Sequence, residues 1–319
     1  MNIRTVGVVG LGLMGRGICT SLLANNFQVV AYDINPESFA AARAHVASAL
    51  EELARHPSVA EAIPENWPSH FQLTADLSPL GDCDFVIESI PEDPVIKQET
   101  IAALERLLPN STPIASNTSA LPISLLQAHC QLPQRIIGMH WAEPCHLTRF
   151  LEIIRGEHTD DATADSAANL GRQLGKDPTI VQRDVPGFIV NRLAYAMYRE
   201  AFWLLENNVA DVDTIDRAFV NAISVWANVA GPFRWMDLSG LPAYAQAMGR
   251  LFPELSQATE TPACFQSMID DGARGAANGR GFYSYTAEEA EAWRAKLVKN
   301  VHATRQRSPL PQPTVKDLS

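Results

Sequence analysis

Three glycines near the N-terminus constrain the fold of this chain more than any other feature. The apolar run from Val6 to Val9 predicts a buried strand. Gly10, Gly12 and Gly15 follow it in the spacing Gly-x-Gly-x-x-Gly, and residues with helical periodicity come next. In doubly wound α/β proteins such glycines permit a tight turn, a close approach of pyrophosphate and close packing of helix on strand. We expect a dinucleotide to contact the turn residues Gly10, Leu11, Gly12, Leu13, Met14 and Gly15.

An acidic residue after the next predicted strand indicates which dinucleotide binds. That strand, Gln28 to Tyr32, leads directly to Asp33, about 20 residues after the glycines, where a carboxylate can accept both ribose hydroxyls of an adenosine. Neither Ile34 nor Asn35 is cationic, so a 2′-phosphate would meet a carboxylate and no arginine. The pattern therefore favours NAD over NADP. The alternative is a glycine turn of another α/β protein, with Asp33 as a surface cap.

The order of predicted elements divides the chain. Residues 1–184 alternate strand-like and helix-like segments, which is typical of a Rossmann-type doubly wound parallel sheet. Residues 185–306 show helical patterns and predict a smaller all-helical domain, and the proline-containing residues 307–319 predict a tail. The fold class is thus α/β with a helical second domain.

Within this scheme the weakest pattern runs from Arg55 to Leu77, where three prolines interrupt it. We expect an irregular connection or a broken helix there. Further strands are expected at 85–87, 113–115, 136–140, 150–154 and 178–181. Helices are expected at 36–53, 95–108, 188–207, 212–220, 238–252 and 261–271.

Composition excludes several classes of protein. A formal net charge of −11 argues against non-specific binding of nucleic acid. The chain has no run of about 18 apolar residues and no basic segment leading into a hydrophobic one, so neither a membrane span nor a secretory signal is predicted. The five cysteines lack a repeated spacing, which favours free thiols in a reducing compartment. We therefore expect a cytoplasmic protein.

An ordered set of motifs identifies a family resemblance over nearly the whole length. Its members after the glycines are residues 86–88, 91–93, 116–119, 138–140, 151–156, 186–192 and 279–283. In order and spacing they resemble the L-3-hydroxyacyl-CoA dehydrogenase family. The resemblance implies an NAD-dependent enzyme of fatty acid metabolism, which interconverts an (S)-3-hydroxyacyl-CoA and its 3-ketoacyl-CoA. It also implies a homodimer formed through the helical domain.

The resemblance assigns the general base to His140. This residue ends a predicted strand, where open α/β sheets place their ligands, and imidazole titrates near neutral pH. It can therefore take a proton from an alcohol as hydride leaves the same carbon. By resemblance, Glu152 on the following strand holds the other ring nitrogen. The alternative is a structural strand-end histidine with Glu152 as a surface charge.

The resemblance also implies that Ser119 and Asn191 contact the substrate oxygen, with Ser119 near the cofactor as well. Each has an alternative structural role, Ser119 as a helix cap and Asn191 as an amide in the first turn of a helix. Glu92 and Lys97 match positions that contact the nicotinamide ribose, the alternative being a solvated ion pair.

A metal site is not expected. His140, Glu143, Cys145 and His146 do not have a recognised zinc spacing.

Three departures from the family concern the substrate. Glu143 stands where the family has an asparagine after the catalytic histidine, and Ala277 replaces a lysine before the closing glycines. The third departure is a shortage of cations after the second strand, where the family has a lysine that contacts coenzyme A. No lysine precedes Lys97, and only Arg43 and Arg55 are strongly basic between Asp33 and Lys97. Coenzyme A carries several phosphate charges, so its binding should be weaker without such a cation.

Two substrate classes therefore stay open. The acyl-CoA thioester is the first interpretation. The alternative is a free 3-hydroxy acid or small alcohol, as in the L-carnitine and L-gulonate dehydrogenases. A non-catalytic NAD-binding structural protein is a further alternative.

Overall fold

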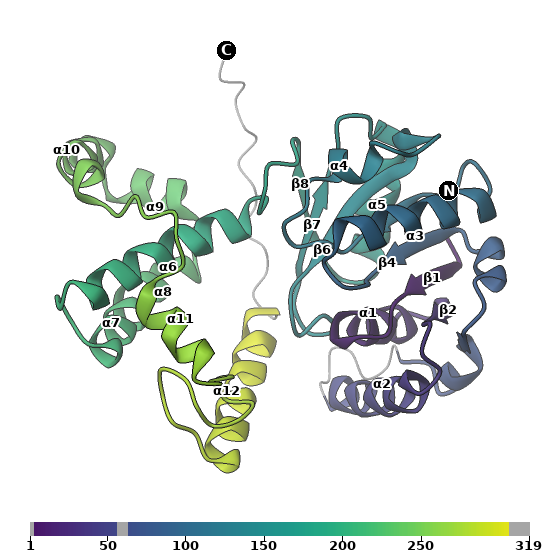
Figure 1. Ribbon diagram of the computed structural model, residues 1–319, viewed down its shortest axis with the longest axis horizontal. Coiled ribbons are helices and arrows are strands. Elements are labelled where there is room, and N and C mark those ends of the chain that lie inside the picture. The colour runs from purple at the N-terminus through teal and green to yellow at the C-terminus, as the bar shows by residue number, and fades with distance from the viewer. Residues whose placement is uncertain (1–2, 56–62, 306–319) are drawn as a thin grey trace. The chain divides into compact units, whose positions relative to one another are not determined.

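The computed structural model describes residues 3–55 and 63–305 and divides the chain into two compact units, residues 1–192 and 193–319 (Figure 1). The domain boundary expected after residue 184 lies eight positions before this division. The expected tail, residues 307–319, falls outside the described residues.

The first unit carries all the strands found in the described residues and the helices that lie between these strands in the chain. Its strands are β1 Thr5–Val9, β2 Gln28–Tyr32, β3 Phe71–Thr74, β4 Phe85–Glu88, β5 Ile114–Ser116, β6 Ile136–Trp141, β7 Phe150–Ile154 and β8 Asp177–Val181. Its helices are α1 Leu13–Ala24, α2 Ser38–Ala54, α3 Pro94–Leu107, α4 Ile123–Gln127 and α5 Asp161–Gln173.

The eight strands form one sheet in the order β3-β2-β1-β4-β5-β6-β7-β8, and every pair is parallel except β6 and β7. The order reverses between β1 and β4, and parallel crossovers are right-handed, so α1 and α2 cover one face while α3 and α4 cover the other. This confirms the doubly wound, mostly parallel α/β fold. Doubly wound sheets bind ligands at such a reversal, beyond the carboxyl ends of the strands, which are here β1 and β4.

The centre of the sheet is fully buried. Val8, Ile87, Ile114 and Ile137, on four different strands, have no exposed surface. Strands covered on both faces by helices need apolar residues at successive positions, which explains the continuous apolar runs in the sequence. This core fixes the strand ends that carry the polar residues of the site.

The segment expected to be irregular contains an edge strand. β3 pairs with β2 in parallel, with Val29 opposite Phe71 and Tyr32 opposite Thr74. The expectation of a plain connection or broken helix was therefore wrong for these four residues. The strand is too short to show a period-two pattern, and only Phe71 among its residues is buried, so pairing with β2 rather than local sequence defines it.

The second unit is helical in its described part. Its helices are α6 Val190–Glu206, which begins within the first unit, α7 Val212–Ala218, α8 Ser224–Ala227, α9 Pro232–Ser239, α10 Leu241–Leu251, α11 Ala263–Asp270 and α12 Ala287–Arg305. Between residues 193 and 304 only Ala230, Ser256, Ala273 and Ala290 are buried. None of the helices in the described parts of the chain is long and apolar enough to span a bilayer.

Candidate active site

The glycine turn follows β1 at the crevice between β1 and β4. Gly10 has a φ of +96°, and a Cβ there would lie 2.6 Å from the Ser89 carbonyl oxygen. A Cβ on Gly15 would lie 1.9 Å from the Gly10 carbonyl oxygen. Any larger residue would therefore collide with backbone at both positions. These two glycines let β1, β4 and α1 approach each other closely.

Gly12, unlike Gly10 and Gly15, has open space around its Cα. A Cβ at this residue would meet no atom within 4 Å, and no side chain caps α1 at this end. The N-terminus of a helix attracts anions through its unpaired N–H groups and its dipole. The open space at Gly12 therefore fits a pyrophosphate, and the turn fits a dinucleotide cofactor.

Asp33 follows β2 directly and lies beside the glycine turn. Its Oδ2 accepts a hydrogen bond of 2.7 Å from the Leu11 N–H, and its Oδ1 accepts one of 2.9 Å from the Asn35 N–H. The carboxylate is thus fixed against the glycine turn. In this position a carboxylate can accept ribose hydroxyls and repels a 2′-phosphate.

His140 and Glu152 lie directly opposite each other on the antiparallel strands β6 and β7. Opposite residues of such a pair project from the same face of the sheet. The His140 Nδ1 lies 2.8 Å from the Glu152 Oε2, and the two side chains are 7% and 1% exposed. A buried carboxylate at Nδ1 favours a proton on that nitrogen, which leaves Nε2 as the basic one.

The second oxygen of Glu152 holds a helix. Its Oε1 accepts hydrogen bonds of 3.0 Å from the N–H groups of Ile189 and Val190, where α6 begins. These two hydrogen bonds fix the position of the carboxylate against the start of α6. Glu152 therefore connects His140 to the turn of backbone that carries Asn191.

Two aromatic rings surround the His140 imidazole. Phe150 meets it edge to face at 5.5 Å between centroids, and Phe188 lies at 5.7 Å. Phe188 is 1% exposed and adopts a φ of +51°, which is rare for a bulky residue and costs conformational energy. Nothing in the sequence pattern predicted a role for either ring. Only the neighbouring Gly187, with a φ of +77°, hinted at an unusual turn.

Ser119 and Asn191 are neighbours. The Asn191 Nδ2 donates a hydrogen bond of 2.8 Å to the Ser119 carbonyl oxygen, and Ser119 itself is exposed. The expected capping alternative does not hold, because α4 begins at Ile123 and the Thr118 hydroxyl accepts from the Leu121 N–H at 2.9 Å. Asn191 does lie in the first turn of α6.

Glu92 and Lys97 are not a solvated pair. The Lys97 side chain is fully buried, with its Nζ 2.7 Å from the Glu88 Oε1 and 3.4 Å from the Glu92 Oε2. Glu92 is 40% exposed. The Ser116 hydroxyl donates to the other oxygen of Glu88 at 2.6 Å. Glu88 and Ser116 belong to the sequence motifs, but no contact between them and Lys97 was predicted. A polar residue at the end of each buried strand was the only signal for these contacts in the sequence.

The two histidines near the β6 end face different partners. His140 binds Glu152, whereas the His146 Nε2 lies 3.2 Å from the Glu52 Oε2 on α2. Glu143 is exposed, and its carboxylate lies 3.9 Å from the Cys145 thiol, which also contacts Met14. Burial raises the pKa of the Cys145 thiol to about 12. A thiol of this kind stays protonated at neutral pH and is a poor nucleophile.

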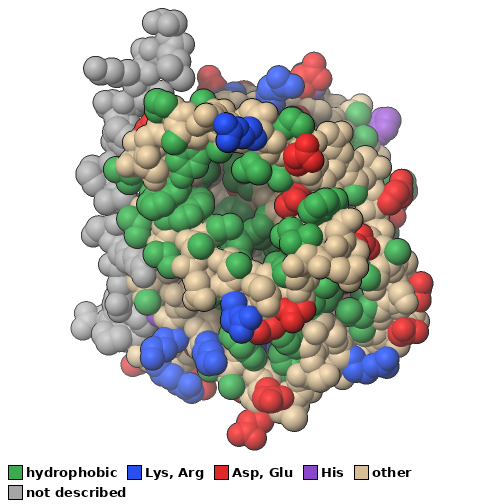
Figure 2. All heavy atoms as spheres, turned by 90° about the vertical axis from the view of Figure 1, so that its left-hand side faces the viewer, with side chains coloured by type: hydrophobic (Ala, Val, Ile, Leu, Met, Phe, Trp, Pro, Cys, Tyr) green, Lys and Arg blue, Asp and Glu red, His purple; other side chains and the backbone are tan. Residues whose placement is uncertain are grey.

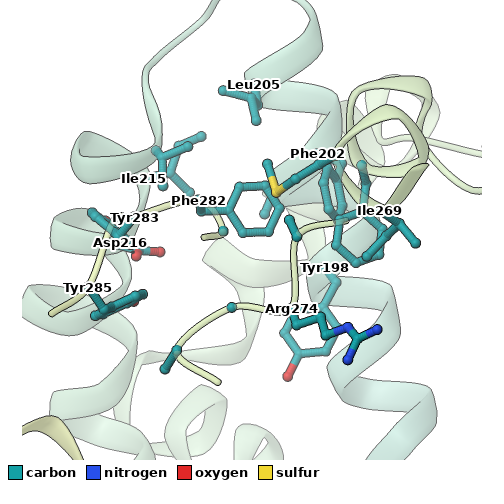
Figure 3. Close-up of a pocket in the computed structure, with 18 residues that line it drawn as sticks. Tyr198, Phe202, Leu205, Ile215, Asp216, Ile269, Arg274, Phe282, Tyr283 and Tyr285 are labelled. Atoms are coloured by element: carbon teal, nitrogen blue, oxygen red, sulfur yellow. Dashed lines mark hydrogen bonds between the residues drawn. The ribbon is translucent and has the colours of Figure 1, made fainter. Parts of the chain in front are cut away.

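A cavity of about 530 Å³ lies in the second unit, among α6, α7, α11 and the loop after α11 (Figure 3). Phe282 projects into its middle and stacks on Phe265 at 5.8 Å, while Phe202 lies beside both rings. The Tyr283 hydroxyl donates to Asp216 at 2.8 Å. Most of this lining is apolar, and the carboxylate in it, Asp216, is already hydrogen-bonded to Tyr283.

Comparison with known proteins gives the same family for both units. Residues 5–185 match the family described as 3-hydroxyacyl-CoA dehydrogenase, NAD binding domain, and residues 187–285 match 3-hydroxyacyl-CoA dehydrogenase, C-terminal domain. The chain is 33% identical over 304 residues to 5-formyl-3-hydroxy-2-methylpyridine 4-carboxylate 5-dehydrogenase of Mesorhizobium japonicum, which covers 95% of this chain and 97% of that protein. It is 32% identical over 286 residues to a probable 3-hydroxybutyryl-CoA dehydrogenase of Bacillus subtilis, covering 89% and 98%.

Solved structures show the same similarity. A crystal structure of the 5-formyl-3-hydroxy-2-methylpyridine 4-carboxylic acid dehydrogenase, described as an NAD⁺-dependent dismutase, aligns with a TM-score of 0.87, 32% identity and coverage of 96% and 98%. The (S)-3-hydroxybutyryl-CoA dehydrogenase of Ralstonia eutropha aligns with a TM-score of 0.71, 32% identity and coverage of 89% and 100%.

Proposed function

Since the chain belongs to the 3-hydroxyacyl-CoA dehydrogenase family and is an NAD-dependent oxidoreductase, we propose that His140 is its general base and Glu152 the carboxylate that orients it. The observation that carries this proposal is the buried hydrogen bond of 2.8 Å between the His140 Nδ1 and Glu152. Bound NAD supplies the hydride acceptor for the substrate carbon. The protein must then remove the hydroxyl proton and balance the charge.

His140 performs the proton step through Nε2. As the alcohol becomes a carbonyl, Nε2 takes the hydroxyl proton and the ring becomes cationic, and in the reverse direction it returns that proton. Glu152 lies against the cationic ring, and its charge is held by the two N–H groups at the start of α6. The Phe150 and Phe188 rings exclude water from the pair, which strengthens the attraction between the two charges.

Asn191 and Ser119 complete the proposed site by holding the substrate oxygen. The hydrogen bond between them keeps both residues at the edge of the site. The Ser119 hydroxyl and the remaining Asn191 donor can reach an oxygen that gains charge during transfer, and such donors lower the barrier.

We place NAD along the residues predicted from the sequence. The turn from Gly10 to Gly15 would hold its pyrophosphate, Asp33 would accept its adenosine ribose, and Glu92 and Ser119 would lie near its nicotinamide ribose. The support is the open cradle at Gly12 and the fixed carboxylate of Asp33.

For the substrate we propose a small free acid or alcohol. Residues 34–96 contain eleven acidic residues and two arginines, and the Arg43 guanidinium lies over the Phe71 ring at 5.5 Å. This excess of acidic over basic residues disfavours the phosphates of coenzyme A. The Mesorhizobium relative, whose name gives a pyridine carboxylate as its substrate, matches this chain over 95% of its length. The 3-hydroxyacyl-CoA thioester of fatty acid metabolism is the second candidate, supported by the 3-hydroxybutyryl-CoA relatives.

One screen separates these candidates. NADH absorbance is followed with acetoacetyl-CoA, with free 3-keto and 3-hydroxy acids, and with a pyridine carbaldehyde carboxylate, using the wild type and His140→Gln. We expect turnover of a free acid, lost by about 10²-fold or more in the variant, because general base catalysis contributes that much. Turnover of acetoacetyl-CoA alone would select the second candidate. Equal rates for wild type and variant would exclude His140 as the base.

We also propose that the protein is a homodimer formed through its helical unit. On the face drawn in Figure 2, hydrophobic side chains gather around a hollow. Phe233 and Leu238 of α9 are 78% and 71% exposed, which suits an interface better than a core. Sedimentation at micromolar concentration tests this, with Phe233→Glu expected to shift a dimer towards monomer. A wild-type monomer would refute the proposal.

A reducing compartment is proposed on the cysteines alone. All five, including the buried Cys19, Cys83 and Cys145, are free thiols. This favours the cytoplasm.

A further inference from the structure

Glu143 has a carboxylate that forms no ion pair within the described parts of the chain. It lies in the loop 142–149 between β6 and β7, and it is exposed. The hydrogen-bond partner found for its carboxylate among the described residues is the Cys145 thiol, 3.9 Å from Oε2. A thiol is a weak donor. The negative charge of Glu143 is therefore available to a ligand.

Buried groups hold the backbone of this loop. Lys176 is 6% exposed, and its ammonium donates to the carbonyl oxygens of Cys145 and Thr148. The Ser21 hydroxyl of α1 donates to the same Cys145 oxygen at 3.2 Å. The loop thus presents the exposed side chain of Glu143 from an anchored backbone, and an anchored group loses less entropy when it binds a ligand.

The loop follows the carboxyl end of β6, beside the pair of His140 and Glu152. This pair is next to the last one between the two strands, which is Trp141 and Leu151. Glu143 follows His140 by three positions, so their Cα atoms lie at most about 11 Å apart, because consecutive Cα atoms are about 3.8 Å apart. A small substrate whose reacting carbon meets His140 can therefore reach the Glu143 carboxylate with a second group.

The same loop packs on the start of α1. The Cys145 Sγ lies 3.7 Å from the Met14 Sδ, and a Cβ on Gly17 would lie 2.8 Å from the Cys145 Cβ. The loop thus joins the strand end that carries His140 to the helix that follows the glycine turn. Glu143 belongs to the part of the molecule where cofactor and substrate are expected to meet.

We propose that Glu143 determines specificity by binding a positively charged nitrogen of the substrate. A carboxylate attracts cations and repels anions, whereas the asparagine implied at this position by the family resemblance carries no charge. Because the described residues supply no ion-pair partner to Glu143, the substrate supplies it on binding. This inference rests on the proposed free acid or alcohol and deepens it, since that substrate carries an ammonium or pyridinium group within reach of its reacting carbon.

Pairs of alcohols that differ by one charge test the proposal. The first pair is 4-amino-3-hydroxybutanoate and 3-hydroxypentanoate, and the second is N-methyl-3-(hydroxymethyl)pyridinium and 3-methylbenzyl alcohol. Within each pair the shapes match, and only one member has a cationic nitrogen. Binding to enzyme saturated with NADH, with which an alcohol does not react, is measured by calorimetry. The proteins are the wild type, Glu143→Gln, Glu143→Asn and the exposed Glu157→Gln as a control for lost charge.

In the wild type, the cationic member of at least one pair should bind about fivefold more tightly than its neutral partner, the upper range for exposed ion pairs. Glu143→Gln and Glu143→Asn should remove this preference by weakening the cationic member alone. Glu157→Gln should keep the preference, because its charge lies outside the loop.

Two results would overturn the proposal. Equal or undetectable binding of both members in each pair by the wild type would mean that the site selects no cation. A preference that survives in Glu143→Gln would mean that another residue selects it. Failure of the proposed proton transfer would appear separately, because His140→Gln should keep the binding preference and only the turnover screen reports on the base.

Discussion

Replacing Glu152 with glutamine tests the proton-transfer site most directly. The carboxylate accepts from the His140 Nδ1 on one oxygen, at 2.8 Å, and from the Ile189 and Val190 N–H groups on the other, at 3.0 Å each. Glutamine has one acceptor oxygen and one donor group. If its oxygen keeps the two backbone donors, its amide N–H faces Nδ1. The imidazole must then carry its proton on Nε2, where the proposed base should be free.

The magnitude follows from this tautomer change. Replacing the carboxylate that orients a catalytic histidine by an amide lowers kcat by about 10⁴ in a serine protease. That factor corresponds to about 5 kcal/mol of transition-state stabilisation. We expect a loss of about 10³ to 10⁴ in kcat for Glu152→Gln, with little change in NAD affinity. The exposed Glu157→Gln removes the same charge near the same strand and should keep full activity.

Nitrogen NMR of His140 gives an assay that needs no substrate. In the wild type, long-range proton–nitrogen spectra should show a protonated Nδ1, and in Glu152→Gln a protonated Nε2. Turnover within tenfold of the wild type would refute the reasoning. So would an unchanged tautomer together with full loss of activity, because Glu152 would then act by charge alone.

Three further predictions concern the cofactor turn and acid stability. Gly12→Ala should fold normally, because the added Cβ meets no atom within 4 Å, but it should lose NAD binding in calorimetry. Gly15→Ala should instead lower the melting temperature sharply, because its Cβ would lie 1.9 Å from the Gly10 carbonyl oxygen. Asp33→Ala should weaken NAD binding by about tenfold and reduce the preference for NAD over NADP. Equal use of NAD and NADP by the wild type would contradict this prediction. Burial lowers the pKa of His45 and of His146 in the folded protein. As the pH falls through about 6.5, the ordinary histidine pKa, the unfolded chain therefore binds more protons than the folded one. The melting temperature should therefore fall as pH drops from about 7 through this range, with a shallower dependence in His146→Gln.

Much of the fold could be predicted because it is encoded locally. The glycine spacing and apolar strand runs depend on contacts within a few residues, and they gave the doubly wound sheet, the helical second unit and NAD, all confirmed by the structure or the family matches. The family motifs also predicted the site residues, whose roles stay proposals. The edge strand β3 was missed, because four residues with one buried side chain carry no periodic signal.

The tertiary structure decided how those residues share their hydrogen bonds. Sequence placed Glu152 on the strand after His140, but only the register of β6 and β7 sets them opposite each other, and only the path of the chain brings the start of α6 to the second oxygen. For Lys97 the sequence suggested a contact to the nicotinamide ribose, with a solvated ion pair as the alternative. Its partners Glu88, Ile90 and Glu92 precede it closely in the chain, and the turn from β4 into α3 brings them to its ammonium. A turn conformation of this kind, and the burial that comes with it, leave no periodic trace in the sequence.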